Sequence, residues 1–317
     1  MAGFFAKRLL AAAFAAAALL ALGGCSSFDR MKHNGGYDEP WAEGADGTVL
    51  GDVVFKPEAG NRMDVCVPAK FDPKRGNGVI VFLHAGSWQR GVRAFEMHNC
   101  RRYAKKGYFA ATIDYTLWSE ESPVTMKRMT EDIGDAASKL RELSQERGWN
   151  LTQMAVSGMS AGGQLALLYA YREKNPPLPL RFAAVTVAPI DFRWEAWDFP
   201  TARFSPRVSM LIVNAGTGSS FSEEEFRSGK ALDAIRSVSP IDAVAPGVPP
   251  TLMGYGEKDF VQNPENGRIL SAALEKAGVK HDLVMYPNSG HLLADDYGAM
   301  LKYHELFARY AKEGFGY

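Results

Sequence analysis

Runs of apolar residues alternate with longer amphipathic stretches along most of this chain. Gly78–Leu83 is continuously apolar, as expected for a strand buried on both faces of a sheet, and Tyr108–Asp114 and Phe182–Ala188 repeat that pattern. Amphipathic periodicity predicts helices at Thr125–Arg147 and Pro264–Ala277. Strands that alternate with helices in this way indicate an α/β fold, with a mostly parallel central sheet and helices on both faces.

Shorter patterns extend this architecture toward both ends of the chain. Gly51–Lys56 and Arg62–Val67 alternate or run apolar around a proline-containing turn, which predicts an antiparallel hairpin. Toward the other end, we expect strands at Pro250–Tyr255 and Lys280–Tyr286 and a last helix at Leu292–Lys312. The folded domain is therefore expected to occupy residues 48–317.

The periodicity weakens between residues 191 and 237, where aromatic residues cluster. This segment joins two predicted strands, so it is expected to form a short cap insertion over one end of the sheet. Two interpretations of its rings stay open: they line a pocket, or they pack the cap onto the body of the domain. The rings in question are Phe192, Trp194, Trp197, Phe199 and Phe204.

The N-terminal residues have the pattern of an export signal rather than of a fold. Lys7 and Arg8 precede the apolar run Leu9–Leu22, which is short for a transmembrane helix. The run ends in Leu-Gly-Gly-Cys, which resembles a bacterial lipobox, and the resemblance implies removal of residues 1–24 and acylation of Cys25. Ser26 resembles the residue found in lipoproteins sorted to the outer membrane. An ordinary signal peptide or an uncleaved anchor remains an alternative.

Residues 25–47 are polar and glycine-rich and are predicted to tether that anchor to the domain. The expected location is the bacterial cell envelope, on the outer membrane facing the periplasm.

Composition and charge narrow the classes of function. The formal net charge is zero, and no basic face predicts a nucleic-acid partner. No metal-binding motif is present, so neither a metal nor another cofactor is expected. Cys66 and Cys100 could pair in an exported protein, or each could be a small buried hydrophobe, and the second interpretation is slightly favoured.

The clearest candidate catalytic motif is Gly158-Met159-Ser160-Ala161-Gly162, a G-x-S-x-G pattern. An apolar strand precedes it and a helix follows it, which is the context in which this motif projects a serine from a tight turn. Glycines are needed because a Cβ would crowd the turn. Ser160 is therefore the candidate nucleophile. An incidental serine at a glycine-rich helix start is the alternative.

A serine nucleophile needs a base and a carboxylate that orients the base. His291 lies in the loop after the last predicted strand, and Asp259 follows the strand Pro250–Tyr255; loops at the carboxyl ends of strands form the site in open α/β sheets. Glu257 is expected to stay solvated or to order its turn, and Asp295 and Asp296 are expected inside the last helix. The chain order Ser160, Asp259, His291 is the α/β-hydrolase order.

His84-Ala85-Gly86-Ser87-Trp88 follows the first central strand and resembles the HGG-x-W loop of hormone-sensitive-lipase-like esterases and kynurenine-formamidase-like hydrolases. Ala85 stands where that pattern has glycine. The resemblance implies an α/β-hydrolase fold with a Ser160–His291–Asp259 triad. It also implies an oxyanion hole formed by the amides of Gly86, Ser87 and Ala161, with His84 bracing the loop.

These patterns predict hydrolysis of a small carboxylic ester through an acyl-enzyme, with an acyl group of roughly acetyl to butyryl size. An amidase or formamidase uses the same parts and is the alternative enzyme. A non-catalytic binding protein on the hydrolase fold is the alternative outside catalysis. The sequence names neither the natural substrate nor the oligomeric state, because one scaffold serves many reactions.

Overall fold

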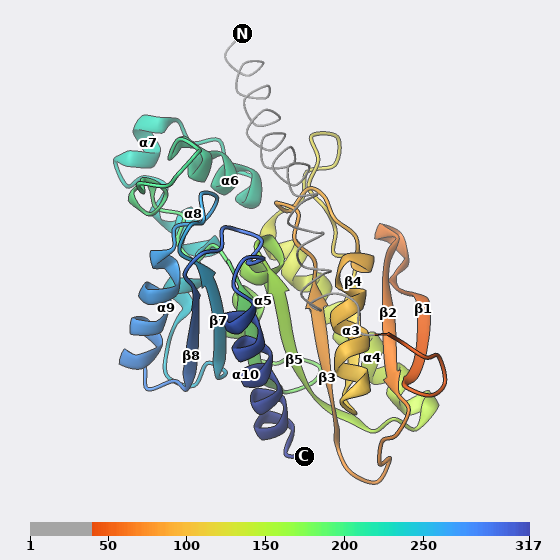
Figure 1. Ribbon diagram of the computed structural model, residues 1–317. Helices are drawn as coiled ribbons and strands as arrows, with labels where there is room; N and C mark the ends of the chain where they lie inside the picture. The colour runs from red at the N-terminus through yellow and green to blue at the C-terminus, as the bar shows by residue number, and fades with distance from the viewer. Residues whose placement is uncertain (1–39) are drawn as a thin grey trace.

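The computed structural model describes residues 40–317, which contain one eight-stranded sheet. Its strand order is β1-β2-β4-β3-β5-β6-β7-β8 (Figure 1). β2 pairs antiparallel with β1 and β4, and all other neighbours are parallel. The strands are β1 (Gly47–Lys56), β2 (Asn61–Pro68), β3 (Asn77–Leu83), β4 (Phe109–Ile113), β5 (Leu151–Met159), β6 (Leu180–Thr186), β7 (Thr251–Gly256) and β8 (His281–Tyr286).

Helices cover both faces of this sheet. The helices α4 (Met126–Arg147), α5 (Ala161–Arg172) and α9 (Glu265–Lys276) pack on one face, and α3 (Met97–Lys105) and α10 (Tyr297–Phe315) pack on the other (Figure 1). Every residue of β3 is buried, and its side chains alternate between the two apolar clusters. The predicted fold class is therefore confirmed.

The strands predicted from apolar runs all form, with boundary shifts of a few residues. β5, the apolar strand expected before the G-x-S-x-G pattern, runs from Leu151 to Met159. The last helix begins at Tyr297, later than the predicted Leu292, so the placement of Asp295 and Asp296 inside it is wrong. Asp296 instead accepts hydrogen bonds from the backbone N–H of Asn288 (2.8 Å) and the Ser289 hydroxyl (2.7 Å), which hold this segment as a loop.

The insertion between β6 and β7 folds into short helices above the carboxyl ends of the parallel strands (Figure 1). They are η3 (Trp194–Trp197), α6 (Arg207–Thr217), α7 (Glu223–Arg227) and α8 (Leu232–Val238). Phe192 and Trp197 are buried in the larger apolar cluster, with ring centroids 5.7 Å apart. These two rings pack the cap onto the body of the domain, as the second interpretation of the cluster had it.

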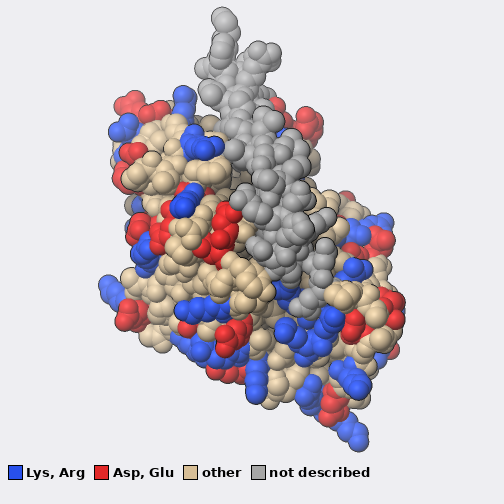
Figure 2. Space-filling model, viewed as in Figure 1, with Lys and Arg blue, Asp and Glu red and all other residues tan. Residues whose placement is uncertain are grey.

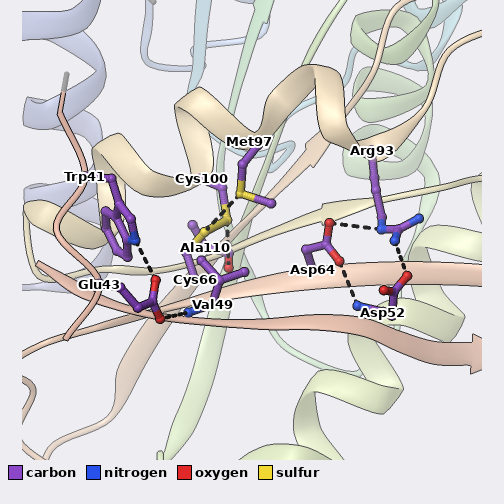
Figure 3. Close-up of a disulfide and its surroundings, with 10 residues drawn as sticks. All are labelled: Trp41, Glu43, Val49, Asp52, Asp64, Cys66, Arg93, Met97, Cys100 and Ala110. Carbon is purple, nitrogen blue, oxygen red and sulfur yellow. Dashed lines mark hydrogen bonds and ion pairs between the residues drawn. A yellow bond between two sulfur atoms is a disulfide. The ribbon is translucent and has the colours of Figure 1, made fainter. Parts of the chain in front are cut away.

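A disulfide joins Cys66 in β2 to Cys100 in α3, with the Cα atoms 5.8 Å apart (Figure 3). The slight preference for two unpaired buried cysteines is therefore wrong. The sequence could not decide this point, because the pairing depends on α3 crossing β2 at the level of Cys66. The bond clamps the antiparallel edge of the sheet to the helix that covers it.

The end of the predicted tether contacts the domain. Glu43 accepts hydrogen bonds from the Trp41 indole (2.7 Å) and from the backbone N–H of Val49 (3.0 Å) (Figure 3). Glu43 also forms a bridge with Gly47, where β1 begins. The signal peptide, Cys25 and the rest of the tether lie outside the described residues.

Among residues 40–317, none of the helices combines the length and apolar character that spanning a membrane requires. Acidic and basic side chains are interspersed over the described part of the face in Figure 2.

Candidate active site

Ser160 lies at the turn between β5 and α5, in a backbone conformation that residues other than glycine rarely adopt. Its φ is 54° and its ψ is −119°. A Cβ on Gly158 would lie 2.5 Å from the carbonyl carbon of Gly162, and one on Gly162 would lie 2.2 Å from the carbonyl oxygen of Leu83. Both positions therefore require glycine, and the sharp turn lifts the Ser160 hydroxyl out at the end of the strand.

His291 and Asp259 reach Ser160 from the loops after β8 and β7. His291 Nε2 lies 3.0 Å from Ser160 Oγ, and His291 Nδ1 lies 2.7 Å from Asp259 Oδ2. Because an ionised carboxylate only accepts hydrogen bonds, Nδ1 carries the proton and Nε2 accepts from the serine hydroxyl. The structure thus brings the three residues named from the sequence into one hydrogen-bonded line.

Asp259 is almost fully buried and is held by the backbone of its own loop. It is 1% exposed. Its second oxygen, Oδ1, accepts hydrogen bonds from the backbone N–H groups of Val261 (2.7 Å) and Gln262 (3.0 Å). These bonds compensate the charge where water is excluded and fix the direction of Oδ2. Glu257 instead pairs with Arg268 at the surface.

The loop that carries His291 is braced by a residue that the sequence analysis misplaced. Lys258 N–H donates to the carbonyl of Ser289 (3.0 Å), and the Ser289 hydroxyl donates to Asp296 (2.7 Å). Burial acts to raise the pKa of Asp296, but hydrogen bonds from Ser289 and Asn288 outweigh it and lower that pKa overall. Asp296 is therefore an anionic brace for the histidine loop. A run of turn-forming residues before it, Pro287–Gly290, was the available sequence signal.

The loop after β3 lies beside the elbow, because Leu83 pairs in register with Gly158. Three successive residues have positive φ: Gly86 at 136°, Ser87 at 53° and Trp88 at 63°. A Cβ on Gly86 would lie 1.9 Å from the carbonyl oxygen of Arg90. The two side-chain-bearing residues in this conformation cost on the order of 1–2 kcal/mol each, so surrounding contacts must hold the loop.

The predicted oxyanion donors lie in these two turns. Within residues 40–317, no hydrogen bond to another residue engages the amides of Gly86, Ser87 or Ala161. The Ala161 amide is the first of helix α5, where the helix dipole adds positive potential. These amides are thus free to donate to a developing negative charge.

His84 lies under this loop. Its ring is 1% exposed and stacks on Tyr115 at 4.3 Å, and its Nδ1 lies 2.9 Å from the Ala85 carbonyl oxygen. The Tyr115 hydroxyl donates to the His84 carbonyl oxygen at 3.0 Å. Burial lowers the pKa of His84, so its ring is neutral. These contacts are those of a structural ring beneath the loop.

Arg93 anchors the far end of the same loop. Its backbone N–H donates to Asp114 (2.7 Å), and its guanidinium pairs with Asp114 (2.6 Å). The guanidinium also pairs with Asp64 (3.0 Å), as Figure 3 shows. The sequence analysis placed Asp114 at the end of a predicted strand but did not connect it with Arg93. A charged residue at the end of an apolar run was the sequence signal that could have found the pair.

A small apolar pocket lies next to the candidate oxyanion loop. The loop after β3, the segment between β4 and α4, α4 itself and the cap helix α6 all contribute to its lining. The lining residues are Ser87, Trp88, Gln89, Trp118, Val124, Met126, Met129, Ile212, Ala215 and Gly216. Met126 and Gly216 approach so closely that a Cβ on Gly216 would lie 3.0 Å from the Met126 side chain. Among the described residues, no group of three His, Cys, Asp or Glu side chains is placed to hold a metal ion.

Comparisons with known proteins bear on the fold and the family. A family model described as alpha/beta hydrolase fold matches residues 80–295, more than half of the chain. Esterase LipC of Mycobacterium tuberculosis is 25% identical over 232 residues, covering 69% of this chain and 54% of LipC. Esterase LipQ of the same organism is 26% identical over 243 residues, covering 73% of this chain and 54% of LipQ.

The chain spans about half the length of these curated relatives. Among solved structures, esterase 2 of Thermogutta terrifontis with propionate bound has a TM-score of 0.64 at 23% identity, covering 86% of this chain and 97% of that one. A truncated carbohydrate esterase from gut microbiota has a TM-score of 0.68 at 16% identity, covering 86% and 99%. At these identities the likeness to solved structures shows the fold.

Proposed function

The chain belongs to the α/β-hydrolase fold family, and from this premise we propose that it hydrolyses small carboxylic esters. The observation that carries the proposal is the line of hydrogen bonds from Ser160 through His291 to Asp259. The relatives named esterases in Mycobacterium tuberculosis support the same reaction class.

In the proposed mechanism, Ser160 Oγ attacks the ester carbonyl carbon while His291 Nε2 takes the hydroxyl proton. The tetrahedral intermediate collapses, the bond to the alcohol breaks, and His291 returns the proton to the leaving alkoxide. His291 then removes a proton from water, which attacks the acyl-enzyme and releases the acid with Ser160 restored. Asp259 holds the imidazole in the required tautomer and stabilises its charged form.

We assign the amides of Gly86, Ser87 and Ala161 to the oxyanion that forms at each tetrahedral step. Donors fixed before the reaction need no reorganisation when charge develops on the oxygen, and each typically contributes ~10²–10³ in kcat. The positive φ values of the loop after β3 and the helix start at Ala161 support this role.

The test combines covalent labelling with a substrate panel. A fluorophosphonate probe should label the wild type and the Ser157→Ala control, because Ser157 is a buried β5 residue, but should not label Ser160→Ala. Ser160→Ala should lose ~10⁴–10⁶ in kcat on an activated acetate ester. Labelling or wild-type turnover in Ser160→Ala would remove Ser160 from the mechanism.

The same panel separates the alternative functions. Acyl esters should turn over faster than matched formamides. Faster hydrolysis of formamides would favour the amidase or formamidase alternative. A folded wild type that neither labels nor turns over any member would favour a non-catalytic binding protein.

We also propose that the mature chain is a lipoprotein anchored through Cys25 to the outer membrane, facing the periplasm. The short apolar run that ends in Leu-Gly-Gly-Cys supports this, as does Ser26 in the next position. A clickable palmitate analogue should label the wild type in a bacterial host, and Cys25→Ala should remove that label. Equal labelling of both proteins would refute the anchor.

A further inference from the structure

Gln164 is a polar side chain with no exposed surface, on the first turns of α5. It follows Ser160 by four residues, and its backbone N–H donates to the Ser160 carbonyl oxygen at 3.0 Å. A buried amide among leucine and alanine residues is costly unless its donor and acceptor groups are satisfied. The hydrogen-bond partners of Gln164 therefore indicate its role.

The Gln164 amide joins three separate segments. Its Oε1 accepts a hydrogen bond from the Trp88 indole N–H at 2.9 Å, and its Nε2 donates to the Val238 carbonyl oxygen at 2.8 Å. Nε2 also donates to Met126 Sδ at the start of α4, at 3.3 Å. An indole N–H can only donate and a carbonyl can only accept, so these partners fix the orientation of the amide. Gln164 thus ties the loop after β3 to the last residue of α8, where the cap returns to the body.

Trp88 is the residue that closes the strained part of this loop. Its carbonyl oxygen accepts a hydrogen bond from Trp118 N–H at 2.9 Å, and its ring packs near Phe192 with the centroids 6.0 Å apart. Its indole N–H is held by Gln164 alone among its described partners. Because Ser87 and Trp88 both have positive φ, release of the indole would let them relax and would turn the neighbouring amides away.

From these contacts we infer that Gln164 is a positioning residue: it holds Trp88, and through Trp88 it aims the Gly86 and Ser87 amides at the substrate oxygen. Ser160 is the N-cap residue of α5, the helix that carries Gln164, so this helix positions both the nucleophile and the loop with the candidate oxyanion donors. The hydrogen bond to Val238 connects the cap to the same helix. This inference rests on the proposed ester hydrolysis.

The test uses two variants that break the same bond from either side. Gln164→Met keeps most of the volume but removes all three amide hydrogen bonds, and Trp88→Phe removes only the indole donor and part of the ring. Each should lower kcat by about 10- to 100-fold, less than outright loss of an oxyanion donor, with KM within about threefold. The double variant should lose no more than the worse single variant, because both remove one shared interaction.

A matched control removes a buried hydrogen bond elsewhere on α5. The Tyr171 hydroxyl bonds to Thr251 Oγ1 at 2.9 Å near the far end of the helix, so Tyr171→Phe should lower Tm and leave kcat unchanged. The rate of fluorophosphonate labelling should fall with kcat in the two test variants, because the phosphonyl oxygen uses the same donors. A merely structural role would move Tm in all three variants and kcat in none.

The outcomes separate the two proposals. If the wild type hydrolyses esters and labels at Ser160, but the folded Gln164→Met and Trp88→Phe proteins keep their kcat or change only KM, the positioning role is wrong while the hydrolase function stands. If Gln164→Met does not fold, Trp88→Phe alone decides. If the wild type neither labels nor turns over esters, both proposals fail together.

Discussion

One carboxylate oxygen of Asp259 accepts hydrogen bonds from the backbone, and the other contacts the His291 imidazole. This arrangement predicts the effect of Asp259→Asn. In Asp259→Asn, the two backbone N–H groups of Val261 and Gln262 would select the amide oxygen, so the NH₂ group would face His291 Nδ1. His291 would then carry its proton on Nε2 and could not accept one from Ser160. We expect kcat to fall about 10⁴-fold with little change in Tm. A loss below tenfold would show that Asp259 does not set the tautomer.

The bond between His291 and Ser160 also predicts a dependence of rate on pH. The imidazole must be unprotonated at Nε2 to take the serine proton, so acid should lower kcat/KM and a rise in pH should restore it. The measurement is kcat/KM for an activated acetate ester between about pH 5 and 8, with thermal melts at each pH to show that the protein stays folded. A flat profile with chemistry rate-limiting would exclude His291 as the base.

At the scale of elements, the segment that starts α3 contains a buried acid, Glu96, which is 8% exposed. Burial raises its pKa to about 7, and a hydrogen bond from Asn99 (2.8 Å) only partly offsets this. The folded state therefore binds a proton that the unfolded chain releases near its ordinary pKa of 4.5. This contribution to stability is present below about pH 4.5 and is lost as pH rises toward 7.

Glu96→Gln should consequently raise the free energy of unfolding above pH 7, by up to about 3 kcal/mol, and change it little near pH 4.5. Urea unfolding at pH 4.5, 6 and 8 measures the difference. Glu58 is exposed and lies in the short helix η1 (Pro57–Ala59), so Glu58→Gln is the matched control and should show no such trend. A stability difference for Glu96→Gln that is the same at all three values would contradict the burial argument.

The Cys66–Cys100 disulfide ties β2 to α3 and closes a segment of 34 residues. A cross-link of that span restricts the unfolded chain, so its removal should lower the free energy of unfolding by about 3–4 kcal/mol. Urea unfolding of the Cys66→Ala/Cys100→Ala double variant measures the loss. A reductant should destabilise the wild type and leave the double variant unchanged; equal behaviour of the two proteins would argue that the bond does not form in solution.

The pairing shows what the sequence could and could not predict about elements. The strands of the central sheet followed from apolar runs, because a strand buried on both faces must be apolar throughout. The cysteine pairing and the late start of α10 did not follow, because each depends on contacts between segments distant in the chain or on loop hydrogen bonds such as those of Asp296. A sequence pattern indicates which face of a helix or strand is buried. It gives little information about which other segments pack against that element.

At the scale of the whole molecule, the candidate site is assembled from four loops that lie together only because of the strand order. The loops after β3, β5, β7 and β8 supply Gly86, Ser160, Asp259 and His291, and these strands run parallel with their carboxyl ends at one edge. The G-x-S-x-G pattern and the placement of His291 and Asp259 after strands made these residues predictable. Gln164 was not predictable, since its partners Trp88 and Val238 belong to a loop and a cap that no local pattern connects.

The relation between cap and body leads to an expectation about acyl-chain length. The cap aromatics Phe192 and Trp197 pack onto the body of the domain, so the expected preference for short acyl chains does not rest on them. The expectation rests instead on the apolar pocket beside the candidate oxyanion loop, because its lining residues leave it little internal space. We expect kcat/KM to be highest for acetyl to butyryl esters and to fall gradually beyond, since each methylene contributes only ~1–3 kcal/mol of discrimination.

Ile212 lines this pocket from α6, so Ile212→Ala should deepen it and move the preferred chain longer by one or two methylenes. Ile235 is equally buried, in α8, but does not line the pocket. Ile235→Ala should therefore lower Tm and leave the chain-length profile unchanged. The measurement is kcat/KM for p-nitrophenyl esters from acetate to dodecanoate with all three proteins. Wild-type rates that climb through the long-chain esters would contradict the pocket limit, and an unchanged profile in Ile212→Ala would place the acyl group elsewhere.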